Sequence, residues 1–172
     1  MHQTSLDNMK KMLDIINCNF KDHKYKIADF GGRRIAKDKS YYTFFKDEPN
    51  VEYLGVDIEA GAGVDIVLTD PYKSPFEDNS IDIVVTGQML EHCEFFWLTV
   101  SEIARILKPG GYLLAVAPSS GHVHRFPVDC WRFYPDAYAA MAKWGGLSVI
   151  DSWTDTNTEW CDAVGILRKP ND

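Results

Sequence analysis

The sequence predicts an α/β fold in which helices cover both faces of a mostly parallel, seven-stranded, doubly wound sheet. Short apolar runs without polar alternation are typical of strands that are buried on both faces. Helical patterns separate several of these runs, and strands that alternate with helices form an open parallel sheet. The chain has 172 residues, the length of one ordinary domain. We therefore expect a single domain over 1–172, with an N-terminal helical segment in 1–25 and the sheet in 26–172.

The first element is an amphipathic helix within residues 4–20. Leu6, Met9, Leu13 and Ile16 recur at helical spacing, and a Ser or Thr precedes them as a candidate cap. An apolar stripe of this kind predicts a helix that covers one side of the sheet.

Seven apolar runs are the candidate strands, and several end in a Gly- or Asp-rich turn. No helix separates the last two runs, so these two are expected to pair antiparallel. Only about seven residues join the second run to the third, too few for a helical crossover. Either that helix is reduced to a loop, or the third run is a very short edge strand. The runs cover residues 26–30, 51–56, 64–68, 81–86, 112–117, 147–153 and 163–167.

Two further helices are expected between the later strands. Over 93–107, Phe96, Val100, Ile103 and Leu107 form one stripe before a Lys-Pro-Gly-Gly stop. Over 135–144, a proline begins the helix and a pair of glycines ends it.

Composition excludes several classes of protein. Lys and Arg total 18 against 25 Asp and Glu, a net charge of −7, which disfavours binding to nucleic acid through its phosphates. No apolar run approaches the roughly 18 residues of a membrane span, and the first eleven residues lack the apolar stretch of a signal peptide. The four cysteines are scattered without a Cys-x-x-Cys pair. We therefore expect a cytoplasmic protein that binds neither nucleic acid nor membrane.

Glycines, acids and polar side chains follow four of the predicted strands, where ligands bind in an open parallel sheet. Glycine lets the backbone approach a ligand closely. An acid after the second strand can accept the hydroxyl protons of a ribose, and an acid after the third can accept from an adenine amine. Each residue alone has an ordinary explanation as a turn or cap, but the joint pattern indicates an adenosine-containing cofactor. The residues concerned are Asp29, Gly31, Gly32, Asp57, Glu59, Asp70, Gln88, Glu91 and His92.

At these residues the chain resembles the class I S-adenosylmethionine-dependent methyltransferases, especially the small group related to ubiquinone and menaquinone methylating enzymes. The most specific stretches are SPFEDNSIDIVVTGQMLEHC (74–93) and EIARILKPGGYLLAVAP (102–118), which resemble that family's fourth strand, helix and fifth strand. RFYPDAYAAMAKWGGLSVIDSW (132–153) resembles the acceptor-side arginine, helix and sixth strand. The resemblance implies S-adenosylmethionine as cofactor and methyl transfer as the reaction.

The resemblance also implies a set of cofactor contacts. Asp29, Gly31 and Gly32 stand where the family packs against the methionine part, Asp57 where it binds ribose, and Asp70 with Thr69 where it reads adenine. The glycine loop departs from the family, because Arg33 and Arg34 replace small residues. These arginines could hold the cofactor carboxylate or an anionic substrate, or could simply be solvated. The full predicted set is Asp29, Gly31, Gly32, Arg33, Asp57, Ile58, Thr69, Asp70, Gln88 and His92.

The segment 119–135 follows the fifth predicted strand and is expected to overhang the methyl group. Methyl transfer requires alignment of the acceptor and, for a hydroxyl, removal of its proton, a task that suits histidine. We therefore predict His124 and Asp129 as catalytic base and orienting carboxylate. Phe126 could help to wall the acceptor pocket. The predicted substrate-binding residues are His122, Arg125, Trp131 and Arg132.

Other roles for this segment stay open. The aromatic residues could belong to the core, and Arg132 could simply pair with Asp129. His122, His124 and Asp129 could together bind a metal ion, although our prediction includes no metal.

The sequence thus predicts a methyltransferase that acts on a small-molecule acceptor, on oxygen or nitrogen. Two alternatives remain: a catalytically silent binding module of the same fold, favoured by the altered glycine loop, and a nicotinamide-dependent oxidoreductase. The acceptor and the oligomeric state are left open.

Overall fold

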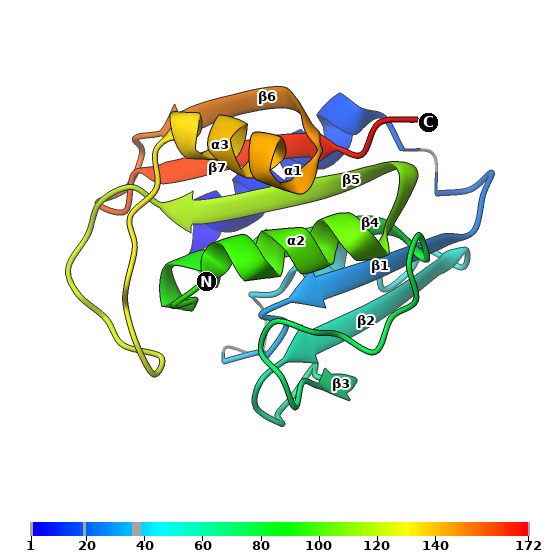
Figure 1. Cartoon of the computed structure of the whole chain (residues 1–172), viewed down its shortest axis with the longest axis horizontal. Coiled ribbons are helices and arrows are strands. Elements are labelled where there is room, and N and C mark those ends of the chain that lie inside the picture. The colour runs from blue at the N-terminus through cyan, green and yellow to red at the C-terminus, as the bar shows by residue number, and fades with distance from the viewer. Residues whose placement is uncertain (1, 19, 36–38, 172) are drawn as a thin grey trace.

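A computed structural model describes residues 2–18, 20–35 and 39–171 of the chain. One seven-stranded sheet runs through the molecule in the order β3-β2-β1-β4-β5-β7-β6 (Figure 1). The first five strands are parallel, and β7 lies antiparallel between β5 and β6. The predicted sheet and its antiparallel final strand are confirmed. The strands are β1 (Tyr25–Phe30), β2 (Val51–Asp57), β3 (Ile66–Val67), β4 (Ile81–Gly87), β5 (Leu107–Pro118), β6 (Ser148–Asp155) and β7 (Asp162–Arg168).

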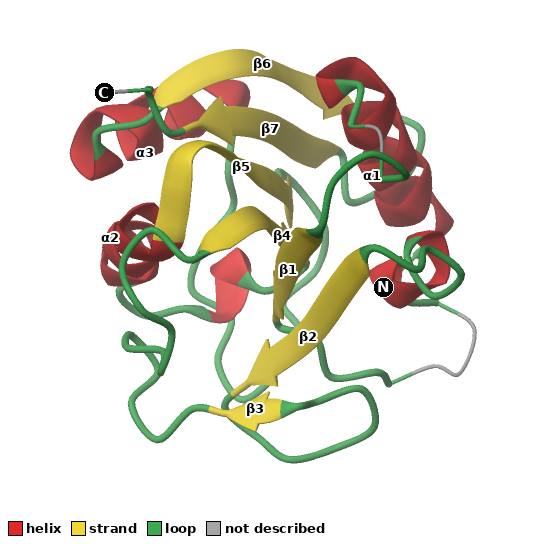
Figure 2. Ribbon diagram, turned by 90° about the vertical axis from the view of Figure 1, so that its right-hand side faces the viewer, coloured by secondary structure: helices red, strands yellow, loops and turns green. Residues whose placement is uncertain are grey.

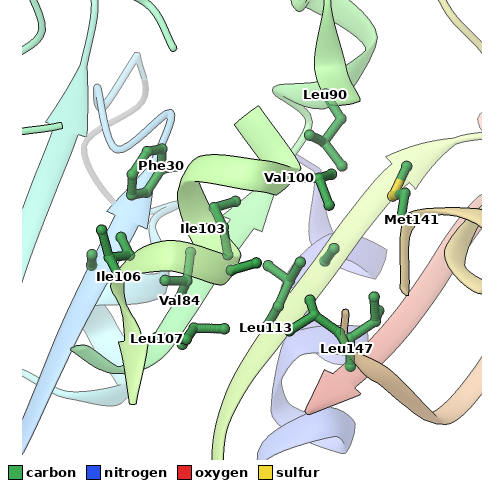
Figure 3. Close-up of a cluster of buried hydrophobic side chains, with 14 of the residues drawn as sticks. Phe30, Val84, Leu90, Val100, Ile103, Ile106, Leu107, Leu113, Met141 and Leu147 are labelled. Carbon is green, nitrogen blue, oxygen red and sulfur yellow. The ribbon is translucent and has the colours of Figure 1, made fainter. Parts of the chain in front are cut away.

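Helices cover both faces of the sheet, as Figure 2 shows: α1 lies on one face, and α2 and α3 lie on the other. A hydrophobic core fills each interface, and Figure 3 shows the one beneath α2, where Val100 and Ile103 are buried. Within the described ranges, no helix has the length and apolarity to cross a membrane. The helices are α1 (Gln3–Ile16), α2 (Phe96–Ile106) and α3 (Pro135–Gly145), with the short 3-10 helices η1 (Tyr41–Phe44) and η2 (Leu90–His92).

Helix α1 covers the sheet as predicted, but its predicted cap is wrong. Leu6 and Met9 are buried in the core, as the apolar stripe indicated. The cap position is His2, and no side chain there accepts a capping hydrogen bond. Ser5 lies inside the helix, where its hydroxyl forms a 2.8 Å hydrogen bond with the buried hydroxyl of Tyr41. The side chain of Ser5, a candidate cap in the sequence pattern, thus forms a tertiary hydrogen bond instead of capping the helix.

The connection between β2 and β3 contains no helix, which resolves the two options that the sequence left. The β3 strand is only two residues long and lies at the sheet edge. The connecting loop lies directly against β2, because the amide of Gly55 donates to the Asp65 carboxylate and the amide of Asp65 donates to the Gly55 carbonyl, both at 2.8 Å. A Cβ on Gly55 would come within 1.8 Å of the Gly63 carbonyl oxygen. Close packing of loop on strand therefore takes the place of a crossover helix.

The parallel strands β1, β2, β4 and β5 all end at one edge of the sheet. Their last residues are Phe30, Asp57, Gly87 and Pro118. A long loop connects β5 to α3 and extends from this edge (Figure 1). The candidate site lies where the strand ends and this loop meet.

Candidate active site

A cleft of about 490 Å³ lies at the carboxyl edge of the sheet, within the size range of small-molecule sites. We call its β1 and β2 side, which includes Gly31, Arg33, Asp57, Ile58 and Glu59, the cofactor half. We call the opposite side, which includes His92, His124, Arg125, Phe126 and Val128, the acceptor half. The cleft is continuous between the two halves.

In the cofactor half, Asp57 is held by the backbone around it. One carboxylate oxygen accepts from the amide of Arg33 at 3.3 Å, and the other accepts from the amide of Glu59 at 3.1 Å. Each carboxylate oxygen has two lone pairs, so both keep capacity for a further donor. The Arg33 guanidinium pairs with the Glu59 carboxylate across the loop. Asp57 is therefore a fixed acceptor at the wall of the cleft.

Gly31 is required where β1 turns into the cleft. Its φ of 83° lies in the left-handed region, and a Cβ would come within 2.7 Å of the Met89 Cβ. Its amide donates to the Val56 carbonyl at 2.9 Å, which ties the turn to β2. The absence of a side chain therefore brings this backbone and Met89 together at the wall of the cleft.

A second, smaller cavity of about 80 Å³ adjoins the cleft behind Gly31. Asp29 lines it and is fully buried, and burial raises the pKa of this carboxyl to about 7. The Tyr53 hydroxyl donates to the same carboxylate at 2.5 Å and partly offsets that effect. Gln88, with a φ of 59°, lines both cavities and donates to Asp162 at 2.9 Å. A strained non-glycine residue therefore stands between the two cavities.

Behind the acceptor half, the buried Asp129 carboxylate is committed to partners on its own segment. Arg132 donates to both of its oxygens, at 2.6 and 2.8 Å, and the amide of His124 donates at 2.7 Å. The Arg132 hydrogen bonds hold the pKa of Asp129 far below its ordinary value. The His124 Nδ1 atom lies 3.4 Å from Asp129, is buried and forms no hydrogen bond with any described residue. Asp129 therefore fixes the loop and lies beside the histidine that borders the cleft.

Glu91 and His92 occupy η2, directly beneath the loop. Glu91 is fully buried, and neither of its carboxylate oxygens has a hydrogen-bond partner. Burial raises the pKa of this carboxyl to about 8. The ring of His92 forms a 2.6 Å hydrogen bond from Nδ1 to the Val128 carbonyl, and burial lowers the pKa of this histidine. The acceptor half thus contains a buried carboxyl group that no described residue satisfies.

The structure brings most of the predicted site residues together. Asp29 and Gly32 line the small cavity, and Arg132 donates to the His122 carbonyl rather than facing the cleft. Trp131 donates to the Cys93 carbonyl and packs against Phe96. The predicted residues that line the main cleft are Gly31, Arg33, Asp57, Ile58, Gln88, His92, His124 and Arg125. Those that line neither cavity are Thr69, Asp70, His122, Asp129, Trp131 and Arg132.

Asp70 lies in a turn beside the cleft, which its neighbours Leu68 and Pro71 line although Asp70 does not. Its carboxylate accepts from the amide of Tyr72 at 2.9 Å, and the residue is exposed. This geometry matches the ordinary turn role that the Asp-Pro sequence also allowed. Arg34, the second arginine of the glycine loop, stacks on the Tyr42 ring at 4.5 Å.

The sequence missed several apolar residues that line the cleft, among them Leu68, Tyr72 and Met89. Tyr72 and Met89 lie in loops, where isolated apolar side chains follow no periodic pattern, and Leu68 was visible only as the last residue of a predicted strand. The sequence showed Glu91 as part of a Glu-His pair after β4, but no feature of the sequence predicted that its carboxyl group would be buried without a partner among the described residues.

Comparison with known proteins identifies the fold. The methyltransferase-domain family model matches residues 39–115. The structure superposes on a 1,6-didemethyltoxoflavin N1-methyltransferase of Burkholderia thailandensis, solved with S-adenosylhomocysteine, with a TM-score of 0.73, 12% identity, and 96% and 77% of the two chains covered. A SAM-dependent methyltransferase of Aquifex aeolicus gives a TM-score of 0.64 at 13% identity, with 94% and 88% covered.

Residues 39–115 thus match a methyltransferase domain, and the chain as a whole has the fold of solved methyltransferases. The resemblance expected from sequence is confirmed, and so is the predicted fold class. Among curated proteins, a ubiquinone/menaquinone biosynthesis C-methyltransferase of Desulfotalea psychrophila is 38% identical over 77 residues, 43% of this chain and 31% of that protein. The matches cover at most 31% of the first four curated relatives.

Proposed function

We propose that the protein transfers a methyl group from S-adenosylmethionine to a small-molecule acceptor, on oxygen or nitrogen. The observation that carries this proposal is the continuous cleft, which joins Gly31 and Asp57 at one end to His124 at the other. A cleft of about 490 Å³ can contain a nucleoside portion and a small acceptor together.

The residues of the cofactor half fit the proposed cofactor. Asp57 has free lone pairs for the two ribose hydroxyls, because each oxygen accepts only one backbone amide. Val56, Ile58 and Leu68 supply apolar wall for the adenine ring. The small cavity beside Gly31 contains the Asp29 carboxyl, an acceptor suited to the ammonium group of the methionine part. When bound, the cofactor supplies an electrophilic methyl group on a sulfonium.

On the acceptor side, His124 borders the cleft and is the candidate base. Its ring accepts the proton that the acceptor's hydroxyl or amine loses as the new bond to the methyl carbon forms. Asp129, 3.4 Å from Nδ1, stabilises the resulting positive charge on the ring. Phe126 and Val128 line the same side and supply apolar wall for the acceptor. The chain thus aligns the acceptor and holds its proton.

Titration with S-adenosylmethionine and S-adenosylhomocysteine tests the first half of the proposal. We expect calorimetry to detect both ligands and no binding of NAD(H). Absence of binding at millimolar cofactor would favour a silent module of the same fold, and a response to NAD(H) alone would favour an oxidoreductase.

Methyl incorporation from labelled cofactor into pooled small metabolites tests the second half. Label on oxygen or nitrogen of a product supports the proposal. Label on carbon would contradict the proposed atom and would place the reaction with the C-methyltransferase named among the relatives. We also propose a cytoplasmic location, which the four free cysteines support.

A further inference from the structure

We propose that Glu91, His92 and His124 bind a divalent transition-metal ion at the base of the acceptor half. One potential ligand atom from each of these residues lies within 4.8 Å of the others. Two imidazoles and one carboxylate form a donor set that suits zinc and similar borderline divalent ions. The inference does not depend on the proposed methyl transfer, but it excludes His124 as the base while the ion is bound, because the ion then holds the one lone pair of the neutral ring.

Glu91 is the strongest evidence for a ligand. A fully buried carboxyl group with two unpartnered oxygens is costly, because buried polar groups normally find a hydrogen bond. The nearby guanidinium of Arg132 forms no hydrogen bond with this carboxyl group: its terminal nitrogens donate to Asp129 and to backbone carbonyls, and its Nε is buried with no partner among the described residues. A bound cation would satisfy this carboxylate.

His92 is oriented as a metal ligand. Its Nδ1 donates to the Val128 carbonyl, so the neutral ring carries its free lone pair on Nε2. Metal-binding histidines commonly donate their second nitrogen to a carbonyl in this way. The same Nε2 lies 3.6 Å from Oε1 of Glu91. Two ligands about 2.0–2.1 Å from a tetrahedral ion lie about 3.3 Å apart, close to that separation.

His124 completes the set from the loop above. Its ring lies 4.9 Å from the His92 ring, measured between centroids, and its buried Nδ1 has no hydrogen bond. Its backbone amide donates a hydrogen bond to the Asp129 carboxylate, so the ring can adjust while the loop stays in place. A shift of about 1.5 Å would bring the widest ligand separation, at most 4.8 Å, to that of a tetrahedral site.

Three protein ligands leave at least one coordination position open. His92 and His124 line the cleft, and Glu91 lies buried behind them. The open position therefore faces the cleft, where water or an oxygen atom of a small ligand can occupy it.

Cobalt(II) binding to the purified full chain, without any cofactor, tests the proposal. We expect one equivalent of Co²⁺ to bind with visible absorption of low-coordinate cobalt, and zinc to displace it. Glu91→Gln, His92→Phe and His124→Ala should each weaken binding at least tenfold, because loss of even an outer partner of a metal ligand costs about 10–100-fold. His122→Ala is the matched control, since His122 lies outside the cleft two residues from His124, and it should bind cobalt as the parent does.

Circular dichroism of each variant establishes that it is folded, and His124→Ala provides the decisive comparison if Glu91→Gln does not fold. Absence of cobalt binding at millimolar metal would overturn the proposal. So would binding that survives His124→Ala, or binding that His122→Ala abolishes. A negative result here leaves the calorimetric binding of S-adenosylmethionine untouched, so the two proposals fail separately.

Discussion

The two halves of the cleft differ in how their polar groups are satisfied. In the cofactor half, Asp57 accepts two backbone amides and Arg33 pairs with Glu59. In the acceptor half, Glu91 and the Nδ1 atom of His124 are buried without partners. In the cofactor half these polar groups therefore have protein partners before any ligand binds. In the acceptor half, the buried groups lack such partners, and a ligand could supply them.

This difference follows from the fold. The cofactor half is built on the ends of β1 and β2, whose register and backbone hydrogen bonds fix its turns. The acceptor half depends on a long loop after β5 that contributes side chains from above. Strand ends favour a rigid binding surface, and loops supply the reacting groups. The predictions below test this contrast.

The largest effect is expected from the pH dependence of stability at Asp29. Its pKa is raised to about 7 by burial, so the folded state favours the neutral carboxyl. That contribution is fully present below the unfolded pKa near 4, and it is lost as the pH rises through about 7. Urea unfolding at several pH values should therefore show the parent losing stability relative to Asp29→Asn, by up to about 1.4 kcal/mol per pH unit in this window.

The Asn variant keeps an acceptor for the Tyr53 hydroxyl, so the comparison isolates the titrating group. The raised pKa of Glu91 affects both proteins equally and cancels. If the free energies of unfolding of parent and variant changed in parallel with pH, Asp29 would not titrate in this range. The effect of burial on its pKa would then be offset by its surroundings.

A steric comparison tests the rigidity of the cofactor half. Gly31→Ala places a side chain at positive φ and against Met89, so we expect a loss of about 3 kcal/mol in the free energy of unfolding. Gly146→Ala is the control, because its φ is 67° but no atom lies within 4 Å of the added Cβ, and about 1 kcal/mol is expected. Equal losses in chemical denaturation would mean that Met89 moves aside and the turn is not sterically fixed.

In the acceptor half, His124→Ala should lower kcat about 10²-fold while the Kd for S-adenosylmethionine stays unchanged, if His124 is the base. His122→Ala is again the control and should affect kcat much less, because His122 lies outside the cleft. Steady-state kinetics with an identified acceptor and cofactor calorimetry provide the two measurements. A variant as fast as the parent would remove His124 from catalysis.

The same contrast explains what could be predicted from sequence. The order and type of the strands follow from apolar runs, and the turns after β1 and β2 carry glycines and acids whose position the strands fix. Gly31 and Asp57 were therefore placed at one edge in advance, and they line one cleft. The predicted residues that do not line the cleft lie mostly in loops, where the path of the loop decides the direction of the side chain.

Asp70 and Trp131 are the informative cases. Asp70 accepts the amide of Tyr72 in its own turn, and Trp131 donates to the Cys93 carbonyl. The first is a local hydrogen bond and the second a tertiary one. Each turns the side chain away from the orientation that a ligand contact would need, and neither follows from the periodicity of the sequence. The unpartnered state of Glu91 depends on the path of the whole 119–134 loop, which spacing along the chain does not determine.

The smallest effect separates these two acids directly. Asp57→Ala should weaken binding of S-adenosylmethionine about tenfold, or about 1.4 kcal/mol, because it removes an acceptor for ribose hydroxyls at a solvent-reachable site. Asp70→Ala should leave the Kd unchanged, because its carboxylate caps its own turn outside the cleft. Calorimetry on both variants provides the comparison. If Asp70→Ala lowered the affinity for S-adenosylmethionine as much as Asp57→Ala does, the turn after β3 would have to rearrange toward the adenine when the ligand binds. The cofactor half would then be no more preformed than the acceptor half.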